Sequence, residues 1–247
     1  MRLNFPSGST KASPATLSWK NNTQTGKGLK GKLRVLLKGE SNVSKDVNGG
    51  GTFYERDVQS RSTLHYLLGL FVRWKQHLKY AKAVRIARKN GATIGKGVVM
   101  PLSFARKANK MLTIGDHVSI QSDNIPVNAP ITIGSHVIIG SGTRILVSSH
   151  NIDSTEWERK PYGITIEDYV WLPTNVLVLP SCRRIGRGAV VGSGSVVVKD
   201  VEPMAVVSGN PAREFKKRRC VHSDLVVESL LGGDYETYKE TWKRRKK

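Results

Sequence analysis

The sequence is poor in cysteine and has no long apolar run. Its 247 residues include only Cys182 and Cys220, too few for a disulfide framework or a cysteine-rich zinc site. A low cysteine count fits a reducing compartment. No run of about 18 apolar residues is present that could span a membrane. The opening MRLNFPSGSTKASP lacks the apolar core of a secretory signal. These absences predict a cytoplasmic protein without a disulfide scaffold or a membrane-spanning segment.

Acidic residues are scarce as well. The chain carries 40 Lys and Arg against 19 Asp and Glu, a formal net charge of +21. Most of the excess lies in the flanks, because residues 1–62 and 63–90 each carry +7 whereas residues 91–213 carry only +3. Basic flanks attract polyanions such as anionic lipid, acidic glycans or nucleic acid. No nucleic-acid-binding motif accompanies the charge, and aromatic residues do not interleave with the basic runs. Nucleic acid is therefore not the expected partner.

Composition divides the chain into four segments, of which residues 91–213 form a repeat and the other three flank it. Residues 1–62 are rich in Ser, Thr, Asn, Gly and Lys and predict a basic, largely irregular extension, with LRVLL at 33–37 as its only apolar cluster. Residues 63–90 predict a basic amphipathic helix with Thr63 as its N-cap and Gly91 as its stop. Residues 214–247 end in DYETYKETWKRRKK and predict a helical basic tail.

Two interpretations of the helix at 63–90 remain open. Apolar residues recur along it at helical spacing, and its second half is crowded with Lys and Arg while Asp and Glu are absent. The helix packs on the main domain with a solvated basic face, or it lies on an anionic membrane surface. The second interpretation predicts a peripheral protein at the inner face of the membrane.

Residues 91–213 contain a six-residue repeat. An aliphatic residue leads each six and is often followed by Gly, with sixes beginning at 94, 114, 133, 139, 145, 166, 172, 178, 185, 191 and 197. A period of six fits neither a helix nor an alternating strand. It predicts a solenoid of short parallel strands with a turn at every sixth residue. Gly after the aliphatic position relieves steric conflict at each turn. Three faces per coil predict a triangular prism with the aliphatic residues stacked inside.

The repeat is interrupted at several places. Its spacing fails between 94 and 114 and between 120 and 133, which predicts excursions or bulges there. A polar stretch at 151–163, NIDSTEWERKPYG, predicts a loop that leaves the prism. The step from 178 to 185 is one residue too long, which predicts a small bulge near Arg183 and Arg184.

The repeat resembles the hexapeptide-repeat acyltransferases over about half of the chain. Its second half closely resembles the C-terminal signature of the sugar O-acetyltransferases of the maltose and galactoside group. VWLPTNV matches the Val-Trp-Ile-Gly motif, VGSGSVVVKDV matches Gly-Ala-Gly-Ser-Val-Val-Thr-Lys-Asp, and SGNPAR matches the closing Gly-Asn-Pro-Ala-Lys/Arg. Pro173 stands where Gly is usual, Ser193 replaces Ala and Val198 replaces Thr, departures that concern local strand geometry.

The resemblance implies a fold and an activity. The fold is an all-β core, a left-handed parallel β-helix over 91–213, with helical extensions on either side. The activity is an O-acetyltransferase that uses acetyl-coenzyme A as acyl donor and needs no metal. The acceptor is a hydroxyl of a saccharide, and the early repeats resemble enzymes of surface-polysaccharide and lipopolysaccharide assembly. The family is trimeric, which implies a homotrimer with each site shared between two chains.

Acyl transfer to a hydroxyl needs a base for the hydroxyl proton, and a neutral imidazole is suited to that task at neutral pH. His150 ends the apolar run ILVSSH just before the polar loop. The resembled family has its general base at this place, which implies that role for His150. Asp153 or Glu158 could orient the imidazole through its other nitrogen, and the sequence does not choose between them.

The resemblance also assigns the acceptor side of the site. Asn128, in IPVNAP, aligns with a polar position that contacts the acceptor. Trp171 is expected to line the acceptor or pantetheine cleft, and Asp153 lies on the loop next to the base. Each of these residues could instead have a purely structural place, Asn128 in a turn and Trp171 as a packed corner residue.

The coenzyme is expected along the C-terminal coils. Lys199 and Arg213 would meet its phosphates as charge-assisted partners, and Asn210 would shape the turn near the adenine. The residues that match coenzyme-binding positions are Thr174, Ser193, Lys199, Asn210 and Arg213.

Two other classes of function compete with acetyl transfer. A metal-dependent β-helix hydratase needs three converging histidines. His117 and His136 occupy outward coil positions, where we expect them to be solvated, and they do not have the hydratase spacing. A polyanion-binding repeat scaffold without catalysis fits the basic flanks, but the intact VSSH segment argues against it.

Overall fold

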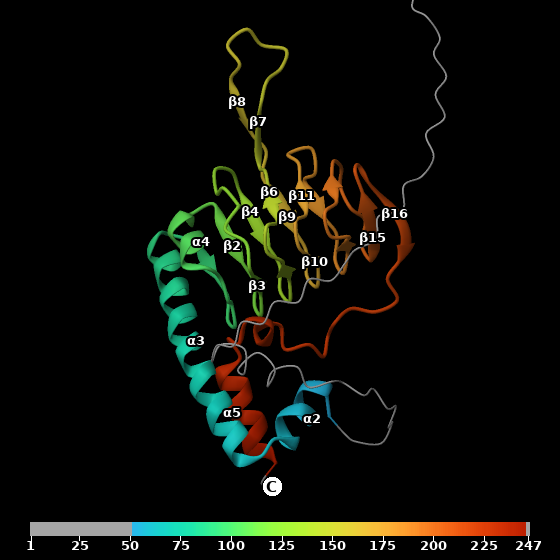
Figure 1. Ribbon diagram of the computed structural model, residues 1–247. Coiled ribbons are helices and arrows are strands. Elements are labelled where there is room, and N and C mark those ends of the chain that lie inside the picture. The colour runs from blue at the N-terminus through green and yellow to red at the C-terminus, as the bar shows by residue number, and fades with distance from the viewer. Residues whose placement is uncertain (1–50, 246–247) are drawn as a thin grey trace, which may run out of the picture. The chain divides into compact units, whose positions relative to one another are not determined.

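The computed structural model describes residues 51–245, and the predicted cluster at 33–37 lies outside them. A β-helix forms the larger part of this region; α3 (Thr63–Lys89) runs beside its first coils, and α5 (Tyr235–Arg244) and α2 (Phe53–Ser60) lie near the other end of α3 (Figure 1). None of the helices within 51–245 combines the length and the hydropathy that crossing a membrane requires.

Three parallel sheets form the faces of the predicted prism. Sheet A consists of β1 (Thr93–Ile94), β2 (Leu112–Ile114), β4 (Ile131–Ile133), β9 (Ile164–Ile166) and β12 (Arg184–Ile185). Sheet B consists of β3 (Ser119–Ile120), β5 (Ile138–Ile139), β10 (Trp171–Leu172), β13 (Val190–Val191), β15 (Ala205–Gly209) and β16 (Ala212–Lys217), the last of them antiparallel. Sheet C consists of β6 (Arg144–Ile145), β11 (Leu177–Val178) and β14 (Val196–Val197). The left-handed β-helix implied by the resemblance is confirmed.

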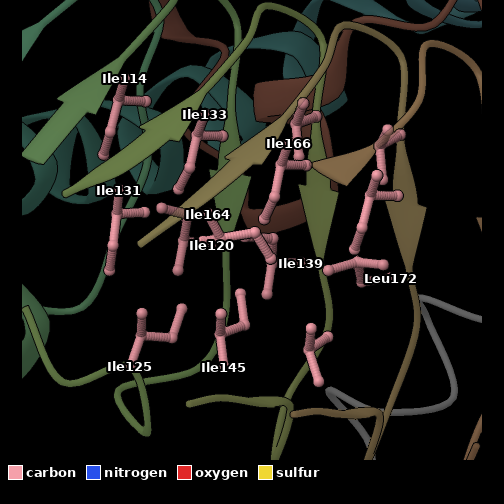
Figure 2. Packing of buried hydrophobic residues seen from close by; sticks show 14 of the residues in the cluster. Ile114, Ile120, Ile125, Ile131, Ile133, Ile139, Ile145, Ile164, Ile166 and Leu172 are labelled. Atoms are coloured by element: carbon pink, nitrogen blue, oxygen red, sulfur yellow. The ribbon is translucent and has the colours of Figure 1, made fainter. Parts of the chain in front are cut away.

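The leading aliphatic residues of the repeat form the core. On sheet A, register pairing joins Ile94, Ile114, Ile133, Ile166 and Ile185 in one row. All five are buried. Figure 2 shows Ile114, Ile133 and Ile166 stacked in this way. Because each coil places an equivalent residue in the same row, the apolar surface of one coil is buried by the next.

Two positions of each six-residue unit shape the corner. At the second position, a Cβ on Gly134 would lie 2.7 Å from the nitrogen of Asp168 in the next coil, so glycine is needed there for close backbone approach. The left-handed backbone occurs two residues later, at His136 (φ +59°) and at Asn175 (φ +58°). Glycine at the second position therefore avoids a clash with the backbone of the next coil, as expected. The positive φ angle occurs instead at the fourth position.

Two departures in the sequence have local structural consequences. Pro173 has no N–H for the next coil, whereas Gly140 at the equivalent position donates to the carbonyl of Leu172 at 2.7 Å. The extra residue predicted near Arg183 and Arg184 is present. The main-chain N–H groups of both arginines donate to Oδ1 of Asp200, at 2.6 and 3.0 Å.

Three excursions interrupt the coils where the repeat fails. The first contains α4 (Leu102–Lys107), and the second spans residues 121–130. The third is a hairpin of β7 (Ser148–His150) and β8 (Arg159–Pro161), which extends away from the prism (Figure 1). All three begin and end within the stacked coils, so the core remains continuous.

The helices form a second, smaller packing layer. They are α2 (Phe53–Ser60), α3 (Thr63–Lys89), the 3₁₀ helix η1 (Val227–Leu231) and α5 (Tyr235–Arg244). The ring of Tyr66 stacks on those of Tyr238 and Trp242, with centroids 5.3 and 4.2 Å apart. Asp234 is buried and accepts hydrogen bonds from Tyr54 and Arg73. The C-terminal segment is thereby tied to helices that precede the β-helix.

The helix boundaries differ slightly from the sequence predictions. The N-cap of α3 is Ser62, whose hydroxyl accepts from the N–H of His65, so the prediction of Thr63 as the cap was wrong. Gly91 follows the C-cap Asn90 with φ +94°, which confirms the predicted stop. Helix α2 lies within the segment predicted to be largely irregular. Its N-terminus is stabilised by a capping box between Thr52 and Glu55.

Candidate active site

His150 lies at the end of β7, on the hairpin that leaves the prism. The hairpin begins at Ser148, three residues after Ile145, the buried second residue of strand β6. At its base, the N–H groups of Tyr162 and Gly163 both donate to the carbonyl of Val147, at 2.8 and 3.3 Å. The side chain of His150 is exposed. The sequence therefore places an accessible imidazole on a short two-stranded support.

The imidazole of His150 is oriented by the main chain. Its Nδ1 lies 2.7 Å from the carbonyl oxygen of Trp157, and the two rings are nearly parallel with centroids 5.4 Å apart. Because a carbonyl can only accept, Nδ1 must carry the hydrogen. In the neutral imidazole the lone pair is then on Nε2. This tautomer suits a general base whose free nitrogen faces solvent.

Neither of the two carboxylates expected to orient His150 holds that position. Glu158 accepts a hydrogen bond from Nδ2 of Asn151 at 2.5 Å. Hydrogen bonds from Ser154 and Asn151 lower the pKa of Glu158 to about 2. Asp153 is exposed on the same loop. Glu158 thus stabilises the loop conformation. The main-chain carbonyl of Trp157, and not the predicted carboxylate, orients the imidazole of His150.

Asn128 lies on the second excursion, just before Ile131 of β4. Its Oδ1 is buried and has no hydrogen-bond partner within residues 51–245. A buried amide oxygen without a partner is unfavourable. A ligand hydroxyl that donated to Oδ1 would satisfy it, which fits the acceptor-contacting role predicted for Asn128.

Trp171 and Thr174 line one open pocket of about 390 Å³. The other walls include Arg218, His222 and two leucines of the C-terminal segment. Arg218 donates to the carbonyl oxygens of Tyr169 and Gly188 at 3.3 Å, and it contacts Nδ1 of His222 at 3.0 Å. The structure therefore brings two predicted site residues together with two that the sequence did not indicate. Arg218 and His222 lie beyond the repeat, and no pattern in the sequence predicts that this segment returns along sheet B.

The other predicted coenzyme residues lie on the last coils. Ser193 is exposed on the coil after Thr174, and the N–H of its neighbour Gly194 donates to the carbonyl of Thr174 at 3.1 Å. Lys199 lines a second pocket of about 310 Å³ with Ala212 and Glu214, the two neighbours of Arg213 in β16. Asn210 is exposed in the turn between β15 and β16. Lys199 and Arg213, the predicted phosphate-binding residues, are thus both exposed at the last coils.

The prediction that His117 and His136 are solvated holds only for His117, whose side chain is 44% exposed, whereas Nδ1 of His136 is buried. The rings of His117, His136 and Tyr169 form a continuous stack, with centroids 5.2 and 4.7 Å apart. Nδ1 of His117 lies 2.9 Å from Oε1 of the buried Glu228. Burial lowers the pKa of His136, and the nearby His117 lowers it further. Within residues 51–245, no three His, Cys, Asp or Glu side chains are grouped so that they could hold a metal ion.

The thiol of Cys182 is not a nucleophile for acyl transfer. Cys182 is buried, and burial raises its pKa to about 12. The thiolate is the nucleophilic form of cysteine, and almost none of it is present at neutral pH. A route through an acylated Cys182 therefore does not fit this structure.

Comparison with known proteins shows the family. No family model matches the chain. A colanic acid biosynthesis acetyltransferase of Escherichia coli strain K12, named WcaF, is 34% identical over 146 residues. The match covers 59% of this chain and 80% of that protein. The chain belongs to the hexapeptide-repeat acetyltransferases. It is an acyltransferase of that family.

Another acetyltransferase is similar over a comparable length. A galactoside O-acetyltransferase of Lactococcus lactis subsp. lactis is 35% identical over 150 residues, which cover 58% of this chain and 70% of that protein. A solved hexapeptide-repeat acetyltransferase of Vibrio cholerae, in complex with acetyl coenzyme A, is 27% identical. Its match covers 76% of this chain and 99% of that chain, with a TM-score of 0.43.

Proposed function

We propose that this acetyltransferase moves an acetyl group from acetyl-coenzyme A to a hydroxyl of a saccharide, with His150 as the general base. The observation that carries the proposal is the hydrogen bond from Nδ1 of His150 to the carbonyl of Trp157. It leaves the lone pair of Nε2 on an exposed ring at the edge of the β-helix.

The proposed reaction is a direct transfer. Nε2 of His150 takes the proton of the acceptor hydroxyl as its oxygen attacks the thioester carbon. The tetrahedral adduct collapses, the carbon–sulfur bond breaks, and the coenzyme leaves as a thiolate. That thiolate takes the proton from the imidazolium, so the products are an O-acetyl ester and the free thiol. No acyl-enzyme intermediate is formed.

Asn128 supports a hydroxyl-bearing acceptor. Its buried Oδ1 has no partner within the described residues, and a sugar hydroxyl is a donor of suitable size. The names of two relatives, one for colanic acid biosynthesis and one for galactoside acetylation, also favour a saccharide. We infer an acceptor among surface-polysaccharide precursors, with Asn128 and Trp171 as contact residues and Asp153 on the neighbouring loop.

The residues of the last coils fit the acyl donor. A pantetheine arm needs an open groove with backbone and side-chain hydrogen-bond partners, and the pocket beside Trp171 and Thr174 offers both. The phosphates of the coenzyme need cations. Lys199 and Arg213 are exposed at the last coils and take that role, and the exposed Ser193 and Asn210 are further candidate contacts.

The direction of the hairpin supports a site shared between chains. The hairpin extends beyond the prism (Figure 1), so His150 projects away from its own coils. We propose a homotrimer in which the hairpin of one chain meets the coenzyme edge of the next. Heterologous contacts of this kind close into a ring under threefold symmetry.

A coenzyme-release assay tests the proposal. The protein is given acetyl-coenzyme A with a panel of monosaccharides, oligosaccharides and nucleotide sugars, and free thiol is measured. We expect acceptor-dependent release that falls about 100- to 10,000-fold in His150→Ala, as for loss of a general base. His65→Ala is the matched control, because His65 is an exposed histidine of α3 and its loss leaves the rate unchanged.

Three other results would contradict the proposed base, coenzyme site or reaction. Release that His150→Ala does not reduce would reject His150 as the base. Absence of acetyl-coenzyme A binding by calorimetry would reject the coenzyme site and favour a polyanion-binding scaffold. Activity that depends on added zinc, with carbon dioxide as substrate, would favour the hydratase alternative.

A further inference from the structure

Large apolar side chains lie exposed along the first half of α3. Each is between 44% and 66% exposed, although a residue of this type is usually buried. A contiguous exposed apolar patch is uncommon on a free protein surface and marks an interaction site. The residues are Leu64, Leu67, Leu68, Phe71, Val72, Trp74 and Leu78.

The same face becomes basic in the second half of α3. Residues 64, 68, 71, 75, 78, 82, 85 and 89 follow one another at intervals of three or four, so they share one side of the helix. The exposed cations of this half are Lys75, Lys79, Lys82, Arg85, Arg88 and Lys89. No Asp or Glu occurs in α3. The face is therefore apolar at one end and positively charged at the other.

The opposite side of α3 is held against the protein. Tyr66 stacks on the rings of α5, and the hydroxyl of Tyr80 donates to the carbonyl of Leu231 at 3.2 Å. Ala83 and Ala87 are buried in the main core. The helix is thus formed before any partner arrives, and the apolar side chains cannot turn inward.

A cationic pocket lies beside the basic end. It has a volume of about 410 Å³ and is lined by Arg85, Arg88 and Lys96 among others, with no Asp or Glu in its lining. The guanidinium of Arg88 donates to the carbonyls of Ile94 and Gly95, at 2.7 and 3.1 Å. Those carbonyls hold the guanidinium in place without neutralising its charge.

We propose that this face, residues 64–89 of α3, docks the protein on a bilayer that contains anionic lipid. The apolar first half enters the boundary between headgroups and acyl chains, and the basic second half and its pocket meet the headgroup phosphates. The proposal goes beyond the acyl transfer and does not depend on the identity of the acceptor.

Charge argues against other occupants of the face. A second copy would bring another α3 whose charged residues are all basic, and residues 1–50 carry nine Lys and Arg against two Asp and Glu. Both would be repelled by the basic half. A nucleic acid would neutralise the cations but leave seven large apolar side chains in water. An anionic bilayer satisfies both halves of the face.

Vesicle co-sedimentation of the full chain tests the docking. The vesicles contain phosphatidylcholine alone, or phosphatidylcholine with about 30% phosphatidylglycerol. We expect binding to the anionic vesicles, weak binding to the neutral ones, and a loss of binding as salt rises. Phe71→Ser lowers the partition coefficient at least about fivefold, because it removes an apolar side chain from the docking face.

Matched variants on β16 separate docking from general surface effects. Phe215 is an exposed phenylalanine outside the face, so Phe215→Ser leaves the partition coefficient unchanged. Lys79→Glu with Lys82→Glu lowers it about tenfold or more, and more than the same exchange at Lys216 and Lys217.

Several results would overturn the proposal. Equal binding by Phe71→Ser and Phe215→Ser would do so, as would the absence of binding to anionic vesicles. A change in oligomeric mass on Phe71→Ser, without a change in vesicle binding, would make the face a self-association surface. Thiol release with a soluble acceptor is measured on the same variants, so that a failure of docking is distinguished from a failure of catalysis.

Discussion

His136 and its neighbours show how a single corner position becomes part of a network. In eight of the eleven repeat units the fourth residue has a left-handed backbone, which histidine and asparagine tolerate better than most residues. At this corner the side chains stack from coil to coil, and the C-terminal segment covers them. The carbonyl of His136 accepts a hydrogen bond from Nε2 of His222 at 2.8 Å. A position that requires a left-handed backbone therefore carries a half-buried, ionisable side chain.

The corner histidines should make stability depend on pH. Burial lowers the pKa of both His136 and His222 from the ordinary value of 6.5. Below that value the unfolded chain binds protons that the folded chain does not. The free energy of unfolding is therefore largest above about pH 7 and falls as pH drops through 6.5, by at most about 1.4 kcal/mol per pH unit for each imidazole.

His136→Asn tests that dependence, because asparagine accepts the left-handed backbone and does not titrate. We expect a shallower fall in the free energy of unfolding between pH 7.5 and 5.5, measured by urea denaturation. The ionisable groups that also act on His136 are His117, Glu228, Asp168 and Asp116. An unchanged slope would show that these neighbours, and not the imidazole of His136, control the dependence.

Lys199 is expected to act on coenzyme binding alone. Lys199→Ala should raise KM for acetyl-coenzyme A about tenfold with little change in kcat, because a charge-assisted contact to a phosphate is lost. Lys110→Ala removes another exposed lysine and serves as the control. Steady-state kinetics with varied acetyl-coenzyme A measure both. A fall in kcat without a change in KM would contradict a phosphate-binding role.

At the scale of the elements, the β-helix depends on close approach between coils. Gly134→Ala would push a Cβ to 2.7 Å from the main-chain nitrogen of Asp168, and the paired strands on either side leave no room to relax. We expect a loss of about 1–3 kcal/mol in the free energy of unfolding. Gly194 has φ +71° and no atom within 4 Å of its position for a Cβ. Gly194→Asn should therefore change stability by less than about 0.5 kcal/mol. Equal effects of the two variants would contradict the packing explanation.

The helical layer depends on one buried carboxylate. Asp234 accepts from Tyr54 at 2.5 Å and from Nε of Arg73 at 3.0 Å, so it joins α2 and α3 to the start of α5. Asp234→Ala leaves Arg73 without its partner and should cost about 3–5 kcal/mol in the free energy of unfolding. The control is Asp57→Ala, which breaks an exposed pair with Arg61 and should cost less than about 1 kcal/mol.

Hydrogen exchange locates the effect of Asp234→Ala. We expect faster exchange in α2 and α5, with the amides of sheets A and B unchanged, because the β-helix has its own core. Uniformly faster exchange would mean that the two layers unfold together.

At the scale of the whole molecule, the prediction concerns assembly. If His150 and Lys199 serve one site from different chains, then mixed trimers of His150→Ala and Lys199→Ala contain intact sites. Random mixing gives about one intact site in four, since each site takes one residue from each chain. Chains unfolded and refolded together should thus regain about a quarter of wild-type activity at low acetyl-coenzyme A. Activity no higher than the mean of the two variants would place both residues in one chain.

The sequence by itself determined the β-helix and indicated several residues of the candidate site. A six-residue period leaves only one way to bury an aliphatic residue in every unit, so the row from Ile94 to Ile185 followed from spacing alone. His150, Trp171 and Thr174 were indicated by local motifs. Those motifs can be recognised in the sequence because each coil makes the same contacts with its neighbours.

Only the tertiary structure decided what the flanks do. The hydrogen bond between His150 and the carbonyl of Trp157 depends on how the loop at 151–158 closes, and the motif does not specify that. The return of Arg218 and His222 to the pocket beside Trp171 rests on contacts between segments far apart in the chain, which have no period. The helix at 63–89 was predictable, but which of its faces is exposed was decided by the packing of Tyr66 and Asp234. Contacts that repeat from coil to coil can be predicted from the period of the sequence. Contacts between distant segments occur once each, so only the folded structure shows them.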